Sequence, residues 1–307
     1  MDDILQTTGL TKIYHGKTVV DTVNIRLHKG EIYGFVGPNG AGKSTIMKML
    51  FNLVKPDSGS IQIFGKKLSN TSFDILRRMG SIIENPYFYE KLSGKENLQL
   101  HCSYMGYPNT EKIDCTLETV GLKDAGEKAV ANYSLGMKQR LAIGRAILTK
   151  PELLILDEPI NALDPEGIKE MRLLFRTLNE EHGITILISS HILSEVEQIA
   201  HRIGIISHGK LLKEISMDEI HEYQTDCIET EVTNIEKAGY LLTEKLNISN
   251  FKILNPNLIR IYDTLHPGEE IINTFVYNGV GVQSLIRRHS TLEDYFFEIT
   301  EGGTKHG

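Results

Sequence analysis

The sequence predicts an α/β protein, with a large doubly wound domain followed by a smaller domain of the α+β type. Three observations indicate this fold class: a glycine-rich loop between a strand and a helix, short aliphatic runs that alternate with helical stretches, and a change of pattern after Lys213. A chain of 307 residues has room for one large and one small domain. We therefore expect the first domain at residues 1–213 and the second at residues 214–307.

The glycine-rich run GPNGAGKST at residues 37–45 follows the strand-like segment Ile32–Val36 and leads into the helix-like segment Thr45–Phe51. Its glycines allow the backbone to curl, so that N–H groups and a helix N-terminus point towards an anion. In such a phosphate-binding loop Lys43 reaches the terminal phosphates and Ser44 offers its hydroxyl group to Mg²⁺. The alternative is an ordinary glycine-rich turn. The residues that we expect to bind a nucleotide here are Gly37, Asn39, Gly40, Gly42, Lys43, Ser44 and Thr45.

Four runs of the first domain are short, aliphatic and bounded by turn residues, as expected for the buried central strands of a sheet. They are Ile32–Val36, Leu153–Asp157, Ile184–Ser189 and Ile203–Ser207. Between about residues 85 and 150 the pattern is mostly helical, which predicts a helical insertion in this domain.

An acidic pair, Asp157 and Glu158, follows the aliphatic residues LLIL at 153–156. This is the Walker B arrangement, in which the first carboxylate holds the Mg²⁺ shell. The second carboxylate, that of Glu158, is placed to polarise the water that attacks the γ-phosphate. Strands that end in acidic residues are common, so the alternative is a solvated strand end. The phosphate-binding loop earlier in the chain favours the catalytic interpretation.

The segment YSLGMKQR at residues 133–140 lies shortly before the acidic pair and opens an amphipathic helix. With this segment the chain resembles the ATP-binding subunit of an ABC transporter, whose signature has the form LSGGQ followed by Gln-Arg. Ser134 and Gly136 match the signature, whereas Leu135 and Met137 depart from it. The resemblance implies that this helix N-terminus approaches the γ-phosphate bound on a second subunit, since hydroxyl, N–H and helix dipole all favour anions. The alternative is a Ser-capped amphipathic helix.

Three further residues match the family. Tyr14 corresponds to the aromatic residue that stacks on adenine, and its alternative is a strand-end tyrosine packed on the core. Asp164, in the segment Asn161–Asp164, corresponds to the loop after Walker B, although it could merely cap the helix that begins at Pro165. His191 corresponds to the switch histidine that contacts the γ-phosphate, and its alternative is a satisfied buried histidine.

Position 84 departs from the family pattern. After the strand-like residues 80–83 the family has a glutamine that reaches Mg²⁺ and the attacking water, whereas this chain has Glu84. A carboxylate binds Mg²⁺ at least as well as an amide, so hydrolysis is expected, while its coupling to motion is open. Glu84 and the following Asn85–Tyr89 resemble lantibiotic-immunity and bacitracin-resistance ATPases, which export antimicrobial peptides. The closing segment Thr291–Phe296 resembles the same subgroup.

The second domain shows both strand and helix patterns. Residues 226–232 alternate, and Phe251–Leu254 and Leu258–Tyr262 flank Asn-Pro-Asn like the two arms of a hairpin. Glu269–Tyr277 carries apolar residues at helical spacing. A capping box formed by Ser290 and Glu293 predicts a final helix, whose apolar face comprises Leu292, Tyr295, Phe296 and Ile299.

The composition excludes several classes of protein. A net charge of −7 argues against non-specific binding of nucleic acid through a general basic field. The three cysteines, Cys102, Cys115 and Cys227, suit neither a disulfide framework nor a zinc site. No apolar run approaches the roughly 20 residues that span a bilayer, and the first residues do not read as a signal peptide. We therefore expect a cytoplasmic protein that other chains hold at the inner face of the membrane.

The motifs and the resemblance together predict a P-loop NTPase core with a helical signature subdomain, which binds ATP and Mg²⁺. The expected function is ATP hydrolysis in an ABC exporter for an antimicrobial peptide such as a lantibiotic. The expected partners are a polytopic membrane permease and a second copy of the chain in an ATP-dependent head-to-tail dimer, with no nucleic acid. The alternative is a soluble ABC ATPase that acts as a mechanical clamp on ribosomes or DNA. Such proteins usually have two cassettes or long coiled coils, and a P-loop kinase would have no use for the signature helix.

Overall fold

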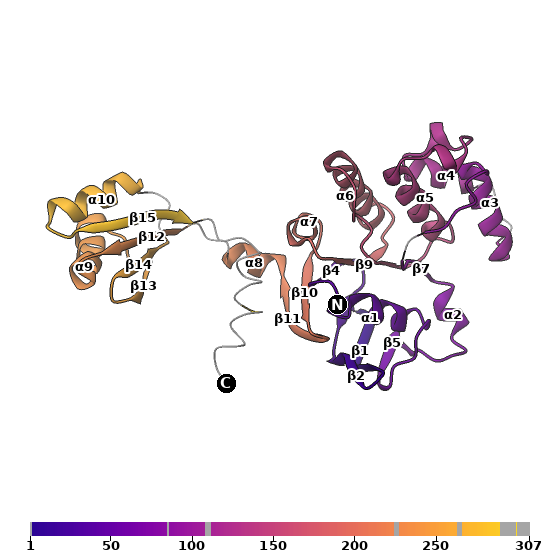
Figure 1. The fold of residues 1–307 in the computed structure, drawn as a ribbon, viewed down its shortest axis with the longest axis horizontal. Helices are drawn as coiled ribbons and strands as arrows, with labels where there is room; N and C mark the ends of the chain where they lie inside the picture. Colours follow the sequence, from indigo (N-terminus) through magenta and orange to yellow (C-terminus); the bar gives the residue numbers. More distant parts are fainter. Residues whose placement is uncertain are drawn as a thin grey trace. The chain divides into compact units, whose positions relative to one another are not determined.

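The computed structural model describes residues 2–84, 86–107, 112–223, 227–262, 266–288 and 299. The chain forms two compact units, residues 1–217 and 218–307 (Figure 1). The first unit extends beyond Lys213, where the sequence pattern changes, because strand β11 (Lys210–Ser216) pairs with β10 (Arg202–Ser207) as far as Ser216. Among the described residues, no helix combines the length and the apolar character needed to cross a membrane.

The centre of the first unit is a six-stranded sheet with the order β11-β10-β4-β9-β8-β7. Strands β10, β4, β9, β8 and β7 are parallel, and β11 is antiparallel to β10. The remaining bounds are β4 (Ile32–Val36), β7 (Met79–Ile82), β8 (Leu153–Leu156) and β9 (Thr185–Ser190). The four runs expected at the centre therefore occupy the four inner positions, so that prediction is confirmed.

Both faces of this sheet are covered, which explains why its strands are aliphatic throughout. Leu154 and Leu156 of β8 pack with residues of α5 (Leu135–Ile147) and α6 (Pro165–Glu180) in one core. Leu153 and Ile155 point to the opposite face and pack with α1 (Lys43–Leu50) in a second core. The short helix α2 (Phe73–Leu76) packs beside the edge strand β7, and α7 (Leu193–Glu197) packs against the inner strands β4 and β9.

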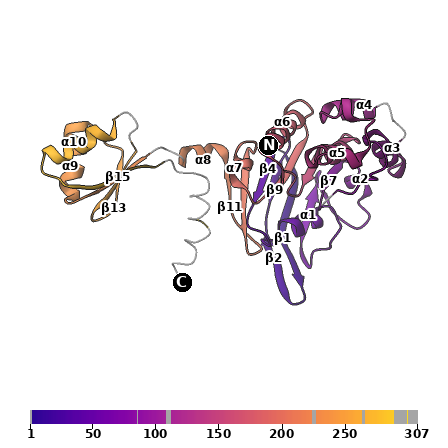
Figure 2. The ribbon, with the colours of Figure 1, turned by 45° about the horizontal axis from the view of Figure 1, so that its top comes forward.

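An antiparallel sheet supports the face that carries α1. Its strands follow the order β2-β1-β5-β6, with β3 paired to β1. Figure 2 shows β1 and β2 on the side of the central sheet away from α4 and α6. The bounds are β1 (Asp3–Tyr14), β2 (Lys17–Val23), β3 (Arg26–His28), β5 (Ser58–Ile63) and β6 (Lys66–Lys67). The sequence analysis did not predict this sheet, because its strands mix polar and apolar residues.

The helical insertion is present as predicted. It comprises α3 (Gly94–Tyr104), α4 (Lys112–Thr119), the 3₁₀ turns η1 (Lys123–Ala125) and η2 (Val130–Asn132), and α5. Ser93 and Glu96 form a complete capping box at the start of α3, which defines where this helix begins.

The second unit has the strand order β13-β14-β12-β15, all antiparallel, in the β-α-β-β-α-β arrangement of ferredoxin-like folds. The predicted hairpin and the helix near residues 269–277 are confirmed, whereas α9 and β15 were not predicted. The bounds are α8 (Met217–Tyr223), β12 (Cys227–Val232), α9 (Ile235–Leu246), β13 (Phe251–Asn255), β14 (Leu258–Ile261), α10 (Gly268–Tyr277) and β15 (Val282–Arg288). The predicted final helix, with Ser290, Leu292, Glu293, Tyr295 and Phe296, lies outside the described residues apart from Ile299. So do the family-like residues Asn85 and 291–296.

Candidate active site

The glycine-rich loop joins the end of β4 to the start of α1. Gly42 immediately precedes α1 with φ 106°, and Gly40 has φ 80°, two conformations that side chains rarely adopt. Gly37 also needs the absence of a side chain, because a Cβ atom there would lie 2.2 Å from the carbonyl oxygen of Ile206 in β10. The glycines at 37, 40 and 42 are therefore required by the path of the loop, as the phosphate-binding interpretation expects.

Lys43 turns back over the loop that precedes it. Its side chain is 5% exposed, and Nζ donates to the carbonyl oxygens of Gly37 at 2.6 Å and Pro38 at 3.3 Å. The same ammonium group lies 3.2 Å from Oε1 of Glu158. A buried cation is thus held at the mouth of the loop, in contact with a carboxylate that comes from a different strand end.

Glu158 connects three of the predicted catalytic elements. Its Oε1 atom faces Lys43, and Oε2 lies 2.7 Å from Nδ1 of His191. Glu158 has φ 48°, a strained value for a non-glycine residue, and its Oε1 atom is buried without a hydrogen-bond partner among the described residues. The structure therefore brings Lys43, Glu158 and His191 together, with one carboxylate oxygen of Glu158 facing the lysine and the other facing the histidine.

Ser189 fixes the acidic pair and was missed by the sequence analysis. Its hydroxyl group donates to Oδ1 of Asp157 at 2.6 Å and accepts from the backbone N–H of Glu158 at 2.9 Å. The side chain is fully buried at the carboxyl end of β9, beside β8. A polar residue at the end of an otherwise aliphatic strand was the available signal, but only the pairing of β8 with β9 shows which residues it contacts.

Glu84 follows β7 and faces the same cleft as the acidic pair. This cleft has a volume of about 490 Å³, and its lining includes Glu84, Asp157, Glu158, Gln139 and Asn161. Glu84 has φ 68°, and its carboxylate is in contact with Nζ of Lys48. Carboxylate and hydroxyl oxygens are the donors that Mg²⁺ prefers, so the side chains of Ser44, Asp157 and Glu84 are of the chemical type that fits this ion.

The signature residues line a different cleft. Ser134 caps α5 by accepting a hydrogen bond from the backbone N–H of Met137 at 3.2 Å. Ser134, Gly136 and Asp164 line a cleft of about 510 Å³ between α5 and the start of α6. Among the residues described, none from 37–45 lines it. Ser134 and Gly136 thus share a cleft with Asp164 and not with the phosphate-binding loop, whereas Leu135 lines both this cleft and that of the acidic pair.

The structure bears on the alternative interpretations of two residues, a helix cap for Asp164 and a core tyrosine for Tyr14. Asp164 caps α6, because its Oδ1 atom accepts from the backbone N–H of Gly167 at 3.0 Å, so the capping interpretation is correct. The same residue also lines the signature cleft. Tyr14 is 39% exposed and stacks against Lys12, whose Nζ lies 5.2 Å from the ring centroid, so it is not a core residue. It lies on the β1–β2 hairpin, which approaches Gly42 at Val19.

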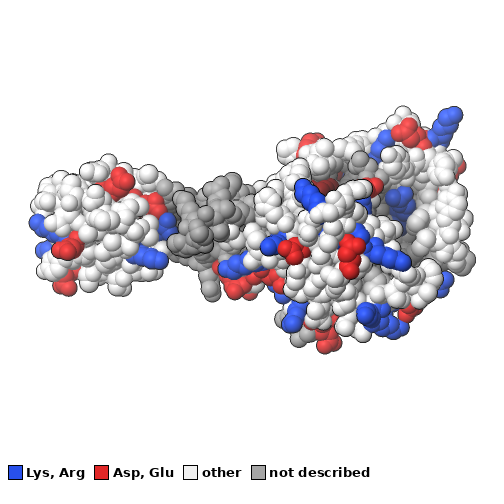
Figure 3. All heavy atoms as spheres, turned by 60° about the horizontal axis from the view of Figure 1, so that its bottom comes forward, with Lys and Arg blue, Asp and Glu red and all other residues white. Residues whose placement is uncertain are grey.

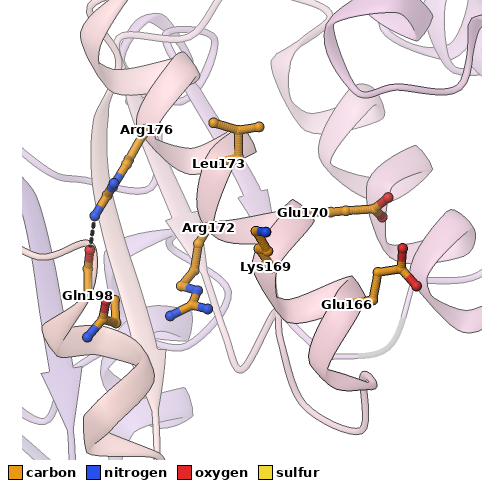
Figure 4. A pocket seen from close by; sticks show the side chains of 7 residues that line it. All are labelled: Glu166, Lys169, Glu170, Arg172, Leu173, Arg176 and Gln198. Atoms are coloured by element: carbon orange, nitrogen blue, oxygen red, sulfur yellow. Dashed lines mark hydrogen bonds between the residues drawn. The ribbon is translucent and has the colours of Figure 1, made fainter.

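A further hollow, of about 510 Å³, lies on the outer face of α6 (Figure 4). Its lining contains three basic and two acidic side chains and none of the predicted site residues. Arg172 lies 3.6 Å from Glu195, and Arg176 donates to the carbonyl oxygen of Gln198. Because the charges offset one another, this hollow carries no signal for a ligand of one sign.

The sequence profile of the ABC transporter family matches residues 20–161. The chain is 52% identical to the uncharacterized ABC transporter ATP-binding protein YcbN of Bacillus subtilis, over 99% of both chains. It is 46% identical to the bacitracin transport ATP-binding protein BcrA of Bacillus licheniformis, also over 99% of both. It is 45% identical to the lantibiotic transport ATP-binding protein SrtF of Streptococcus pyogenes, over 70% of this chain and 92% of that one.

A solved structure has the same architecture in its core. The dimeric structure of MJ0796, a bacterial ABC transporter cassette, superimposes with a TM-score of 0.63 and 25% identity, over 69% of this chain and 98% of that one. The sequence and structural likenesses thus indicate the same family and fold as the motifs in the sequence.

Proposed function

The chain belongs to the family of ABC transporter ATP-binding proteins, and we propose that it is the ATPase of an exporter that protects cells from an antimicrobial peptide. ATP binding and hydrolysis follow from the family. The structural observation that carries the catalytic assignment is the carboxylate of Glu158, held between Lys43 and His191. The peptide cargo is supported by the bacitracin and lantibiotic transport proteins among the relatives.

In this proposal each side chain has a stated role in hydrolysis. Lys43 pairs with the β- and γ-phosphates, and the loop N–H groups bind their remaining oxygens. Glu158 accepts a hydrogen bond from the attacking water and polarises it, and His191 contacts the γ-phosphate and orients Glu158. Ser189 holds the acidic pair in place. Ser44, Asp157 and Glu84 would hold Mg²⁺, which when bound neutralises charge on the phosphates.

The separation of the signature cleft from the phosphate-binding loop supports a composite site. Ser134 and Gly136 present a capped helix N-terminus in a cleft that lacks the residues of the phosphate-binding loop. A helix N-terminus favours a negative charge, but the anion must then come from a second copy of the chain. We therefore propose that two copies bind ATP head to tail, each with its signature residues over the other's nucleotide.

Exposed aromatic side chains mark the proposed permease contact. Tyr87 is 88% exposed, Tyr104 is 72% exposed, and the hydroxyl group of Tyr104 lies 3.4 Å from that of Tyr89. Aromatic residues are enriched at protein interfaces, and exposed groups of them on a monomer usually mark one. Tyr87 lies three residues after Glu84, so this surface is next to the proposed metal site. In this proposal the permease also keeps the chain at the cytoplasmic face of the membrane.

The clamp on ribosomes or DNA is the weaker candidate. Both of these relatives are named as transport ATP-binding proteins, and the face in Figure 3 shows basic and acidic side chains interspersed. An extended basic surface is the usual footprint of a nucleic-acid partner.

Cell protection tests the proposal. The chain is expressed with its membrane partner in a sensitive bacterium, and the minimal inhibitory concentrations of bacitracin and of a lantibiotic are measured. We expect a rise for at least one peptide, which Lys43→Ala abolishes and Lys66→Ala, on the distant β6, retains. No rise for a panel of such peptides, with the complex assembled in the membrane, would contradict the peptide cargo.

A further inference from the structure

Glu84 is in contact with a cation on the helix that begins at the phosphate-binding loop. Its Oε1 atom meets Nζ of Lys48, on α1. Lys48 comes four residues after Ser44, so the two side chains lie one turn apart on one face of the helix. The exposure of the α1 residues agrees with this placement. Ser44, Thr45 and Lys48 are half-buried, while every other residue of α1 is buried.

We propose that Lys48, one helical turn from Ser44, is a positioning residue that holds the carboxylate of Glu84 and competes with Mg²⁺ for it. This rests on the proposed function, in which Ser44 and Glu84 are metal ligands. The Glu84 side chain is 66% exposed, so it has room to turn from one partner to the other. In this proposal the carboxylate turns away from Lys48 to reach the metal ion, so metal binding through Glu84 weakens the pair.

The charge of Glu84 is what makes this arrangement possible. The family's glutamine is neutral and would attract the ammonium group of Lys48 only through a weaker hydrogen bond. A glutamate instead places a third carboxylate in the cleft with Asp157 and Glu158. Lys48 offsets that additional negative charge while Glu84 is away from the metal position. Glu84, which replaces the family's glutamine, and Lys48 thus act together: the lysine balances the charge of the carboxylate while that carboxylate is not bound to metal.

Removal of the Lys48 charge gives a direct test. Lys48→Met keeps most of the side-chain stem, and the Mg²⁺ midpoint is read from titrations of binding of a fluorescent, non-hydrolysable ATP analogue. Because exposed ion pairs contribute up to about 1 kcal/mol, the midpoint should fall by about two- to fivefold. Lys48→Arg should restore the original midpoint. Nucleotide affinity in EDTA should change less than the Mg²⁺ midpoint, which separates metal competition from a structural defect.

A Glu84→Gln background distinguishes this mechanism from simple charge repulsion. In that background Lys48→Met should leave the Mg²⁺ midpoint unchanged, because the carboxylate that it releases is gone. An equal shift of the Mg²⁺ midpoint in both backgrounds would mean that Lys48 acts directly on the metal. No shift in either background would mean that the ion pair has no effect on metal binding. Either result overturns the proposal.

A matched control is Lys66→Met, which breaks the 2.7 Å ion pair with Asp74 away from the cleft and should not move the midpoint. Failure of the proposed function would look different from failure of the Lys48 proposal. In that case the unmodified chain itself would show no Mg²⁺-dependent binding of the nucleotide.

Discussion

Glu158→Gln should nearly abolish hydrolysis and also strengthen the binding of ATP. Loss of a positioned general base typically costs about 10²- to 10⁴-fold in rate. The gain in binding follows from Lys43, whose Nζ lies 3.2 Å from the carboxylate that would be neutralised. At that distance Coulomb's law with an effective dielectric constant near 20 gives about 5 kcal/mol before desolvation is subtracted.

The net gain must be smaller than this Coulomb energy. Exposed ion pairs retain about 1 kcal/mol or less. Because the side chains of Lys43 and Glu158 are only 5% and 21% exposed, we expect an intermediate value of about 1.5 kcal/mol. With the competing carboxylate gone, ATP affinity should therefore rise roughly tenfold.

Two assays on the purified chain measure these effects: phosphate release for hydrolysis and fluorescence anisotropy of labelled ATP for binding. Glu152→Gln is the matched control, because Glu152 lies just before β8, at the opposite end from Glu158, and pairs with Arg78 at 2.7 Å. It should leave both quantities unchanged. Wild-type hydrolysis by Glu158→Gln, or weaker ATP binding, would refute the reasoning.

The remaining predictions concern the partner subunit, the second unit and pH. Ser134→Arg should stop turnover yet retain nucleotide binding, and mixing it with Lys43→Ala should restore part of the ATPase rate, since one composite site then stays intact; complete inactivity of the mixture would leave the composite site unsupported. A chain that ends at residue 217 should bind ATP like the full chain, because every nucleotide motif precedes that residue, and a folded truncation without affinity would contradict this. Burial, followed by the charge of Arg145, lowers the pKa of His101 below its ordinary 6.5. The neutral form of His101 therefore stabilises the folded state above pH 6.5, and this contribution is lost as the pH falls towards the lowered pKa. Between pH 6.5 and 5 the thermal midpoint of the wild type should consequently fall more than that of His101→Gln, which lacks this group.

The sequence predicted those parts of the fold and site that depend on local pattern. The loop at 37–45 and the acidic pair after β8 are short motifs whose geometry follows from glycine conformations and from an aliphatic strand. Buried parallel strands also carry a continuous apolar signal, which is why the four inner strands were placed correctly. The helical insertion was found for a similar reason, since its helices are long enough to show their spacing.

What the sequence did not predict depends on contacts between distant residues. Strand β1 pairs with β5 about 50 residues later, and polar residues on both hide the apolar alternation. The contact of Lys48 with Glu84 spans 36 positions, so neither residue suggests the other. The role of Ser189 required knowledge that β9 lies beside β8. The catalytic and metal roles of the site residues stay predictions until they are measured.

ATP-driven movement of peptide by the purified complex tests the central claim most directly. The chain and its membrane permease are reconstituted in liposomes with the ATPase subunit outside, and uptake of labelled bacitracin or lantibiotic is followed after addition of ATP and Mg²⁺. Our account predicts uptake with ATP, none with a non-hydrolysable analogue, and none with Glu158→Gln. Peptide uptake that is equal with and without hydrolysis, or ATP hydrolysis without uptake of any such peptide, would contradict it.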